Sequence, residues 1–249
     1  MKTCFLILIW SCLLISTSRA LGDVLTISYL NRPPYYYEED HKASGFLIEL
    51  QKKILQDAGI EAEFKVRPPK RIMLEIKNPK NHYCSVGWFK KPDRERFAKF
   101  TLPIYQNEPV VVLTTKQNKH LFSRHTSLKE VFLDNTLTFG GMESFSYGAT
   151  IDQMIRDLSP RRYKAFYEQQ QLIVMLLRQR ISYMLIAPEE IETLIRSAKL
   201  SPSHFTSIQM SDIPLGNKRY LMCSQGVSDE LINKINRSIV RIIGGSLPN

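Results

Sequence analysis

The amino-acid sequence predicts an α/β protein of two lobes, each with a mostly parallel β-sheet flanked by helices. Short runs of β-branched and aromatic residues alternate with segments of helical periodicity along most of the chain, which is typical of parallel α/β sheets. The polar residues 115–124 have no hydrophobic periodicity and follow an apolar strand at 109–113, so they indicate a crossover to a second lobe. The 249 residues are enough for one large domain or for two small lobes with a core each.

The N-terminus has the three parts of a secretory signal peptide. Met1-Lys2 is a short positive region, residues 5–15 are almost wholly apolar, and Ser18-x-Ala20 is a small-residue cleavage pattern. We therefore expect residues 1–20 to be removed, which leaves a periplasmic protein of 229 residues. A lipoprotein attached through Cys12 is the alternative, although the neighbouring Trp10 makes that a poor attachment site.

The mature chain is expected to be basic and not to span a membrane. Removal of the signal peptide lowers the formal net charge from +10 to +8, and no later stretch approaches the roughly 20 apolar residues of a membrane helix. A basic excess is compatible with anionic small ligands, or it reflects only the general composition of the host's proteins. Export and the lack of long basic runs with interleaved aromatic residues argue against nucleic acid as a partner.

The first half of the chain contains alternating strand and helix signals. Residues 24–29 read as a strand that Pro33-Pro34 ends. Apolar residues then recur at helical spacing from Phe46 to Leu55, and Asp57-Ala58-Gly59 ends this helix. The next expected elements are a strand at 62–66, a short amphipathic helix at about 72–76, and strands at 83–89 and 109–113.

The second half repeats this alternation. Residues 128–133 are expected to form a short helix or turn and 136–139 a strand, after which the loop 140–148 opens a helix at about 149–158. Glycine and hydroxyl residues between a strand and a helix N-terminus expose N–H groups that tend to bind anions or polar groups. Further strands are expected at 163–167, 181–186, 207–210 and 218–223, and helices at 169–178, 189–198 and 227–243.

A charged turn interrupts the apolar sequence in the middle of the first half. The strand 83–89 runs into Lys90-Lys91-Pro92-Asp93-Arg94, and the chain becomes apolar again at Phe97. Such a turn holds a cation at a strand end, where α/β sheets tend to bind ligands. The alternative is that these residues form only a solvated charged turn.

This turn and its surroundings resemble a known family. Lys91-Pro92-Asp93-Arg94 followed by Phe100-Thr101-Leu102-Pro103-Ile104-Tyr105 resembles the central signature of the family 3 periplasmic solute-binding proteins. Pro33-Pro34-Tyr35 and Gly45-Phe46-x-x-Glu49-Leu50 resemble the family's opening pattern. The resemblance implies a type 2 periplasmic binding protein fold that closes by hinge motion at two crossover strands. It divides the chain into lobe 1, residues 21–113 and 217–249, and lobe 2, residues 114–216.

The resemblance also implies a set of ligand-binding residues. In the family the arginine of the turn grips a carboxylate, and Arg94 matches that position; a planar guanidinium suits a bidentate anion. Tyr35 matches an aromatic residue that packs on the ligand. The other residues expected at the site are Arg71, Trp88, Glu143, Ser144, Ser146 and Tyr147.

Two cysteines remain in the mature chain, Cys84 and Cys223. Two cysteines in an exported protein favour a disulfide. In the resembled fold the returning strand that carries Cys223 lies beside the strand that carries Cys84, which makes a bridge between them plausible; two buried free thiols are the alternative. Neither the cysteines nor the five histidines have a metal-ligand spacing, so neither a metal nor another cofactor is expected.

One position departs from the family's pattern. Amino-acid binders of the family carry an acidic residue where this chain has Ala187, and that residue holds the ammonium group of the ligand. A ligand ammonium without this partner would be desolvated and unpaired. Unless Glu143, Glu168 or Glu189 substitutes for the missing residue, we therefore expect a carboxylate-bearing or aromatic ligand rather than an ordinary amino acid.

The implied function is ligand binding by a monomer that serves an ABC permease or a membrane sensor, without catalysis. The alternative is a periplasmic enzyme similar to cyclohexadienyl dehydratase, which shares the fold. Such an enzyme needs a carboxylate in the cleft for proton transfer, and Glu143 and Glu168 are the candidates.

Overall fold

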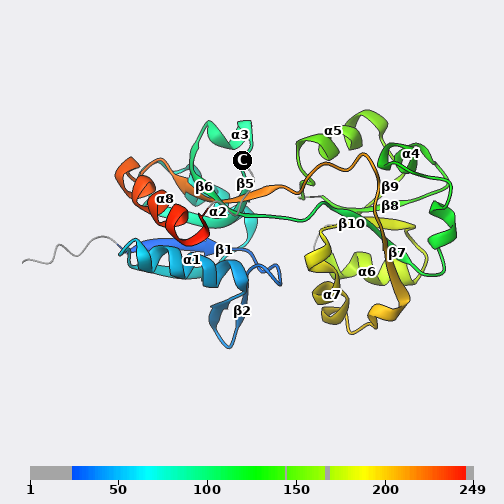
Figure 1. The fold of residues 1–249 in the computed structure, drawn as a ribbon, viewed down its shortest axis with the longest axis horizontal. Helices are drawn as coiled ribbons and strands as arrows, with labels where there is room; N and C mark the ends of the chain where they lie inside the picture. Colours follow the sequence, from blue (N-terminus) through cyan, green and yellow to red (C-terminus); the bar gives the residue numbers. More distant parts are fainter. Residues whose placement is uncertain (1–23, 144, 166–168, 245–249) are drawn as a thin grey trace, which may run out of the picture.

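The computed structural model describes residues 24–143, 145–165 and 169–244. Two lobes lie next to each other along the longest axis and are joined by extended segments of chain (Figure 1). Each lobe has a five-stranded sheet with helices around it, so the predicted α/β class is confirmed. The predicted signal peptide, Ser144 and Glu168 lie outside the described residues. Within the described ranges, no helix has the length and apolar character needed to cross a membrane.

Lobe 1 is built on a sheet with the strand order β4-β1-β5-β12-β6. β1 pairs in parallel with β4 and β5, whereas β12 pairs antiparallel with β5 and β6, so the sheet is mixed and not mostly parallel. The strands are β1 (Leu25–Tyr29), β4 (Ala62–Val66), β5 (Tyr83–Phe89), β6 (Ala98–Gln106) and β12 (Lys218–Ser224), with a hairpin of β2 (Tyr37–Glu39) and β3 (Lys42–Ser44). The helices are α1 (Phe46–Asp57), α2 (Pro69–Lys77), α3 (Pro92–Glu95) and α8 (Asp229–Ile243).

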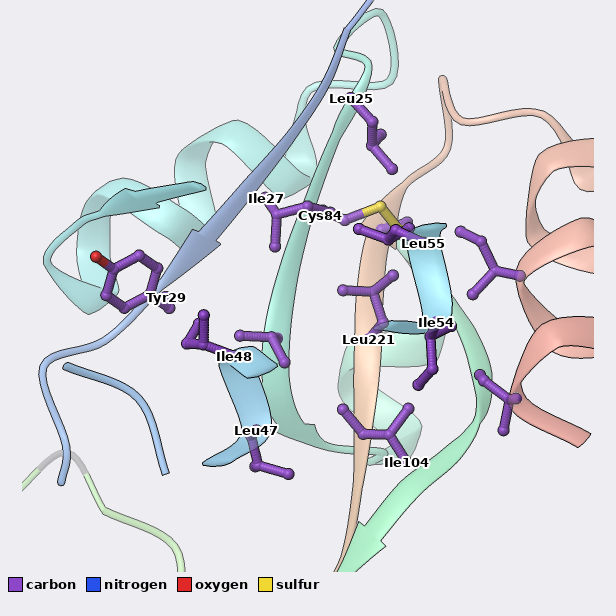
Figure 2. Close-up of a cluster of buried hydrophobic side chains, with 14 of the residues drawn as sticks. Leu25, Ile27, Tyr29, Leu47, Ile48, Ile54, Leu55, Cys84, Ile104 and Leu221 are labelled. Carbon is purple, nitrogen blue, oxygen red and sulfur yellow. A yellow bond between two sulfur atoms is a disulfide. The ribbon is translucent and has the colours of Figure 1, made fainter. Parts of the chain in front are cut away.

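The core of lobe 1 lies between this sheet and the two long helices α1 and α8. α1 and α8 each bury one face at helical spacing against the sheet, and Ser228 caps the start of α8. An aliphatic side chain in this core contributes about 1.5–3 kcal/mol when it is fully buried. Figure 2 shows part of the cluster, which includes Leu25, Ile27, Leu47, Ile48, Ile54, Leu55, Ile104 and Leu221.

Lobe 2 has the strand order β11-β7-β10-β8-β9. β8 pairs in parallel with β9 and β10, and β7 pairs antiparallel with β10 and β11. The strands are β7 (Val111–Thr115), β8 (Phe139–Met142), β9 (Arg162–Ala165), β10 (Tyr183–Ile186) and β11 (Phe205–Ile208). The helices are α4 (Leu128–Leu133), α5 (Ala149–Leu158), α6 (Gln169–Leu177) and α7 (Pro188–Ser197), with short turns η1 (Lys119–Phe122) and η2 (Pro202–His204).

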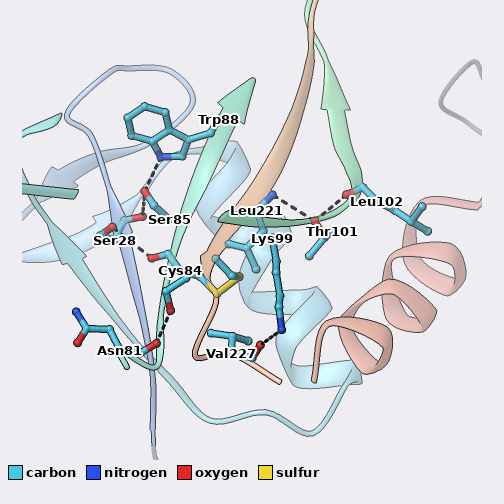
Figure 3. Close-up of a disulfide and its surroundings, with 12 residues drawn as sticks. Ser28, Asn81, Cys84, Ser85, Trp88, Lys99, Thr101, Leu102, Leu221 and Val227 are labelled. Carbon is cyan, nitrogen blue, oxygen red and sulfur yellow. Dashed lines mark hydrogen bonds between the residues drawn. A yellow bond between two sulfur atoms is a disulfide. The ribbon is translucent and has the colours of Figure 1, made fainter. Parts of the chain in front are cut away.

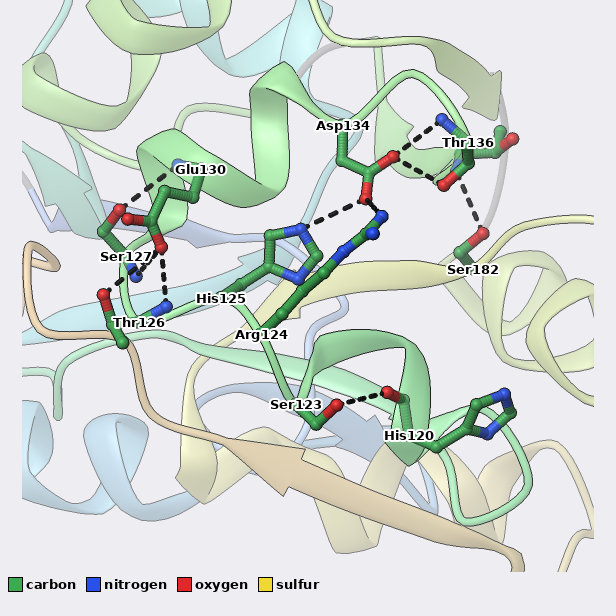
Figure 4. Close-up of polar contacts among 11 residues, drawn as sticks. His120, Ser123, Arg124, His125, Thr126, Ser127, Glu130, Asp134, Thr136 and Ser182 are labelled. Atoms are coloured by element: carbon green, nitrogen blue, oxygen red, sulfur yellow. Dashed lines mark hydrogen bonds and ion pairs between the residues drawn. The ribbon is translucent and has the colours of Figure 1, made fainter.

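Polar contacts fix both ends of α4 (Figure 4). At its start, Ser127 and Glu130 form a capping box. At its end, Asp134 accepts hydrogen bonds from Thr136 and Arg124, and His125 Nε2 lies 3.1 Å from its Oδ2. The bonds from Thr136 and then Arg124 hold the pKa of Asp134 well below its usual range. This carboxylate therefore anchors the segment that leads into β8.

The crossovers require one correction to the expected lobe boundaries. A boundary between residues 113 and 114 would cut through β7, but β7 pairs along its length with strands of the second sheet. The change of lobe therefore falls between β6 and β7, where Asn107 N donates to Asn217 O at 3.0 Å and joins the two crossovers. Gly216 permits this approach, because a Cβ there would lie 1.7 Å from the carbonyl oxygen of Asn107.

The disulfide between Cys84 and Cys223 is present (Figure 3). The two residues are register partners on the antiparallel strands β5 and β12, and both are fully buried. The bridge closes a chain loop with a sequence separation of 139 residues, which includes all of lobe 2. Loop-closure entropy for this length corresponds to about 5 kcal/mol.

Candidate functional site

Two cavities lie between the lobes. The outer one has a volume of about 460 Å³ and is lined by residues 30–33 and 66–69 of lobe 1 and by residues of β8, α6 and α7 of lobe 2. The inner one, of about 30 Å³, reaches the crossovers at Asn107 and Asn217. Both are lined by Arg32, Phe145, Gln169 and Glu190, so these four residues stand between the two spaces.

An ion pair between Arg32 and Glu190 bridges the lobes at this position. Arg32 Nε and Nη2 donate to the two carboxylate oxygens of Glu190, each at 2.8 Å. The Arg32 guanidinium also lies 4.6 Å from the ring centre of Phe145. Burial lowers the pKa of Arg32, but the charge and hydrogen bond of Glu190, together with Tyr36 and Tyr35, outweigh it and raise that pKa above its usual range.

Local structure places both partners. Arg32 begins a tight turn after β1, closed by hydrogen bonds from Arg32 N to Tyr36 O at 2.7 Å and from Tyr35 N to Arg32 O at 3.1 Å. Glu190 lies in the first turn of α7, which begins at Pro188. A carboxylate is favourable at a helix N-terminus, so Glu190 is stabilised there although it is only 2% exposed.

A hydrogen-bond network connects this ion pair to the crossovers. Tyr35 OH donates to Glu190 Oε1 at 3.0 Å and accepts from Asn107 Nδ2. Asn107 also donates to Glu189 Oε1, and its Oδ1 accepts from Arg219 Nε at 2.7 Å. Burial and then the charge of Glu190 raise the pKa of Tyr35 far above its usual value, so its hydroxyl is a donor.

Arg219 is a buried cation at the inner cavity. It is 2% exposed, its guanidinium lies 4.0 Å from the ring centre of Tyr35, and Nη1 donates to Tyr36 OH and Gly87 O at 3.0 Å each. None of these contacts is with a carboxylate. In the described parts of the chain Arg219 has no ion-pair partner, and Asn107 links it by hydrogen bonds to the carboxylate of Glu189.

A second ion pair crosses between the lobes, from Lys91 beside α3 to Asp152 in α5, at 3.1 Å. Asp152 also accepts from Tyr147 N at 2.8 Å and from Ser146 Oγ, and Gly148 N donates to Ser146 Oγ at 3.2 Å. The donors of this loop were expected to hold an anion or a polar group of the ligand. Two of them, Ser146 Oγ and Tyr147 N, instead donate to the carboxylate of Asp152.

The residues predicted from the sequence divide into three groups. Ser146 and Tyr147 line the inner cavity, and burial raises the pKa of Tyr147 to about 12. Tyr35 is fully buried and touches the site through Glu190 and Arg219, so it does not form an exposed stacking surface. The third group lines neither cavity and consists of Arg71, Trp88, Arg94 and Glu143.

The members of the third group have other partners. Arg94 donates to Phe89 O at 2.8 Å and stacks 4.7 Å from the ring of Trp88, and burial lowers its pKa. Since Phe89 itself lines the inner cavity, Arg94 is one residue removed from it. Arg71 pairs with Glu75 and Glu143 with Lys164, both on the surface.

The family model of the bacterial extracellular solute-binding proteins, family 3, matches residues 25–244. The chain belongs to this family. Among curated proteins no significant match is found. The predicted family is confirmed.

Solved structures support the type 2 periplasmic binding protein fold. An ancestral arginine-binding protein bound to arginine is 16% identical, with a TM-score of 0.67 over 88% of this chain and 92% of that one. An arginine-, lysine-, histidine-binding protein from Geobacillus stearothermophilus is 14% identical, with a TM-score of 0.68 over 90% and 91%. An arginine transport-system binding protein from Legionella pneumophila is 17% identical, with a TM-score of 0.66 over 90% and 95%.

Arg32, Arg67, Asn107, Glu190 and Arg219 line the cavities of this family 3 protein, and none of them was predicted from the sequence to be a site residue. A usable signal was Pro188-Glu189-Glu190, because a proline followed by two carboxylates is typical of a helix start. Glu189 accepts from Asn107 of the crossover, and Glu190 accepts from Arg32 and Tyr35 of lobe 1. Ala187, which stands where the resembled amino-acid binders carry an acidic residue, lines the inner cavity and brings no charge to it.

Proposed function

We propose that this solute-binding protein captures a small carboxylate-bearing solute between its lobes and delivers it to an ABC permease. The surplus positive charge of the outer cavity supports this most directly. The charged residues that line it are Arg32, Arg67 and Glu190. Arg32 and Glu190 form an ion pair and neutralise each other, which leaves the positive charge of Arg67. Arg67 makes no ion pair in the described parts of the chain, and its side chain is exposed. A carboxylate is the natural partner of such a guanidinium.

The size and walls of the cavity suit this class of solute. A volume of about 460 Å³ lies in the range of small-molecule sites, roughly 300–1,000 Å³. Pro68, Pro69, Phe145 and Leu194 supply apolar surface from both lobes. A carboxylate with an aromatic or aliphatic body would therefore contact both lobes and favour closure by hinge motion.

A basic amino acid is the competing ligand, because arginine-binding proteins are among the structures with the same fold. Glu190 is the acidic group of the outer cavity that would hold its side chain, and both oxygens of Glu190 are already bound by Arg32. These contacts therefore favour a carboxylate-bearing solute without a cationic side chain as the ligand. Of the two carboxylates considered for an enzymatic role, Glu143 is paired with Lys164 and lines neither cavity, and Glu168 lies outside the described residues.

The test is a binding screen with the protein after removal of co-purified ligand by partial unfolding and refolding. Dicarboxylates, aromatic acids, acidic amino acids, L-arginine and L-lysine are compared by thermal shift and titration calorimetry. Tight binding of a carboxylate without a cationic side chain supports the proposal. Selective binding of L-arginine or L-lysine would refute the ligand class but keep the transport role, and turnover of prephenate would favour the enzyme.

Permease and sensor partners are separated by a transport assay. Cells that lack this protein should lose uptake of the radiolabelled solute if it serves a permease. Retained uptake together with a lost transcriptional response would point to a sensor.

A further inference from the structure

The contacts around Arg32 bind its guanidinium group along one edge and over one face. Glu190 offers its two oxygens to Nε and Nη2 at 2.8 Å each, Phe145 offers a ring face at 4.6 Å, and Tyr35 fixes the carboxylate with a hydrogen bond. Bidentate pairing and stacking on an aromatic face are the two interactions that distinguish a guanidinium from an ammonium group. The site is therefore shaped for this one chemical group.

The guanidinium that fills the site belongs to the chain itself and comes from the opposite lobe. Arg32 lies in the turn after β1 of lobe 1, whereas Glu190 and Phe145 belong to lobe 2. Both cavities are lined by Arg32, so its side chain stands where a solute that extends from the outer to the inner cavity would lie.

We propose that Arg32 is a specificity residue that occupies a guanidinium subsite and so excludes cationic solutes. This inference rests on the proposed function and deepens it, because it names which solutes the cleft rejects. A free cation must compete with a tethered one whose effective concentration is in the millimolar range. In the wild type the buried carboxylate of Glu190 is paired with Arg32. Removal of Arg32 would leave this carboxylate without its partner and so create a vacant cation site.

The other ion pair between the lobes lacks these features and is a matched control. Lys91 carries an ammonium group, and Asp152 has its oxygens shared with Ser146 and Tyr147. Neither Lys91 nor Asp152 lines the outer or the inner cavity. Removal of Lys91 should not create a subsite for a guanidinium.

The experiment is chemical rescue of the variant Arg32→Ala. The unfolding midpoint is measured with methylguanidinium at about 10 mM, above a millimolar effective concentration, and with methylurea as the neutral isostere. We expect methylguanidinium alone to stabilise Arg32→Ala, and neither compound to stabilise the wild type or Lys91→Ala. The double variant Arg32→Ala, Glu190→Gln should lose the response.

Titration with L-arginine gives an independent readout. We expect Arg32→Ala to bind it at least about tenfold more tightly than the wild type. Equal affinity in the two proteins, or a folded Arg32→Ala that ignores methylguanidinium, would overturn the proposal. If Arg32→Ala does not fold, Arg32→Gln, which retains volume and polarity, is tested with the same two ligands and the same criterion.

These outcomes are separable from the proposed function. A failure of all carboxylates to bind the wild type would reject the proposed function while the rescue of Arg32→Ala still stood. Carboxylate binding without rescue would reject only the role of Arg32.

Discussion

Replacement of Glu190 by glutamine should shift the protein from the closed to the open arrangement of its lobes. Glu190 is 2% exposed and Arg32 22%, and their two charge-assisted hydrogen bonds join lobe 2 to lobe 1. Glutamine keeps the volume and one acceptor but directs an NH₂ group at the second guanidinium N–H. Loss of one partner of a buried pair costs roughly 3–5 kcal/mol, and partial exposure of Arg32 reduces this to about 2–3 kcal/mol. Because each 1.4 kcal/mol is tenfold, the ratio of closed to open molecules should fall about 30- to 150-fold.

Small-angle X-ray scattering of the ligand-free protein measures this change directly. The radius of gyration of Glu190→Gln should exceed that of the wild type, whose scattering should match the closed arrangement. Glu192→Gln is the matched control on the same helix, because the Arg196–Glu192 pair is 67% and 70% exposed and lies within α7. Exposed pairs contribute at most about 1 kcal/mol, so this variant should scatter like the wild type. Identical scattering of all three proteins would show that the Arg32–Glu190 pair does not hold the lobes together.

Three further predictions concern other parts of the molecule. Reduction of the Cys84–Cys223 disulfide should lower the free energy of unfolding by up to about 5 kcal/mol, measured by urea denaturation with and without reductant; an unchanged midpoint would contradict the loop-entropy argument. Arg67→Ala should weaken binding of the carboxylate solute about 10- to 100-fold in calorimetry. Arg71→Ala should leave binding unchanged, because the guanidinium of Arg71 pairs with Glu75. If Arg71→Ala weakened binding and Arg67→Ala did not, the anion site would lie at α2. Asp134 has a pKa below its usual value, so its stabilisation is full above about pH 4 and is lost as the pH falls. Asp134→Asn should therefore be less stable than the wild type at pH 7, with the difference shrinking towards pH 2; a constant difference would exclude the ionised form as the cause.

The sequence was sufficient for many of the helices and strands because their signals are local. The period of Phe46 to Leu55 and the turn at Pro92 predicted α1 and the end of β5 to within a residue or two. The lobe boundary was misplaced because Val111 to Leu113 reads as the end of an apolar lobe 1 strand, whereas its partners, β10 and β11, come about 70–100 residues later. Strand pairing is a long-range property that the pattern of one strand does not contain.

The candidate site was harder to predict because its residues depend on partners from the other lobe. Arg32 and Glu190 are 158 positions apart, and each alone resembles a surface charge. Tyr35 was expected to pack on the ligand, yet the turn that follows β1 buries it under Arg219. The loop before α5 was expected to hold an anion, but Asp152 in the first turn of that helix takes the donors itself.

Asn107 shows why the crossover between the lobes needs an amide rather than a charged or apolar side chain. Its Oδ1 accepts from the cation Arg219, and its NH₂ group donates to the anion Glu189 and to Tyr35. An aspartate could accept from Arg219 but would repel Glu189, and a leucine would leave the buried guanidinium without its acceptor. Since Arg219 and Tyr35 belong to lobe 1 and Glu189 to lobe 2, the amide is satisfied at both ends by groups from the two lobes. Under the proposed hinge motion, the crossover would carry part of the closure energy, separately from the Arg32–Glu190 pair.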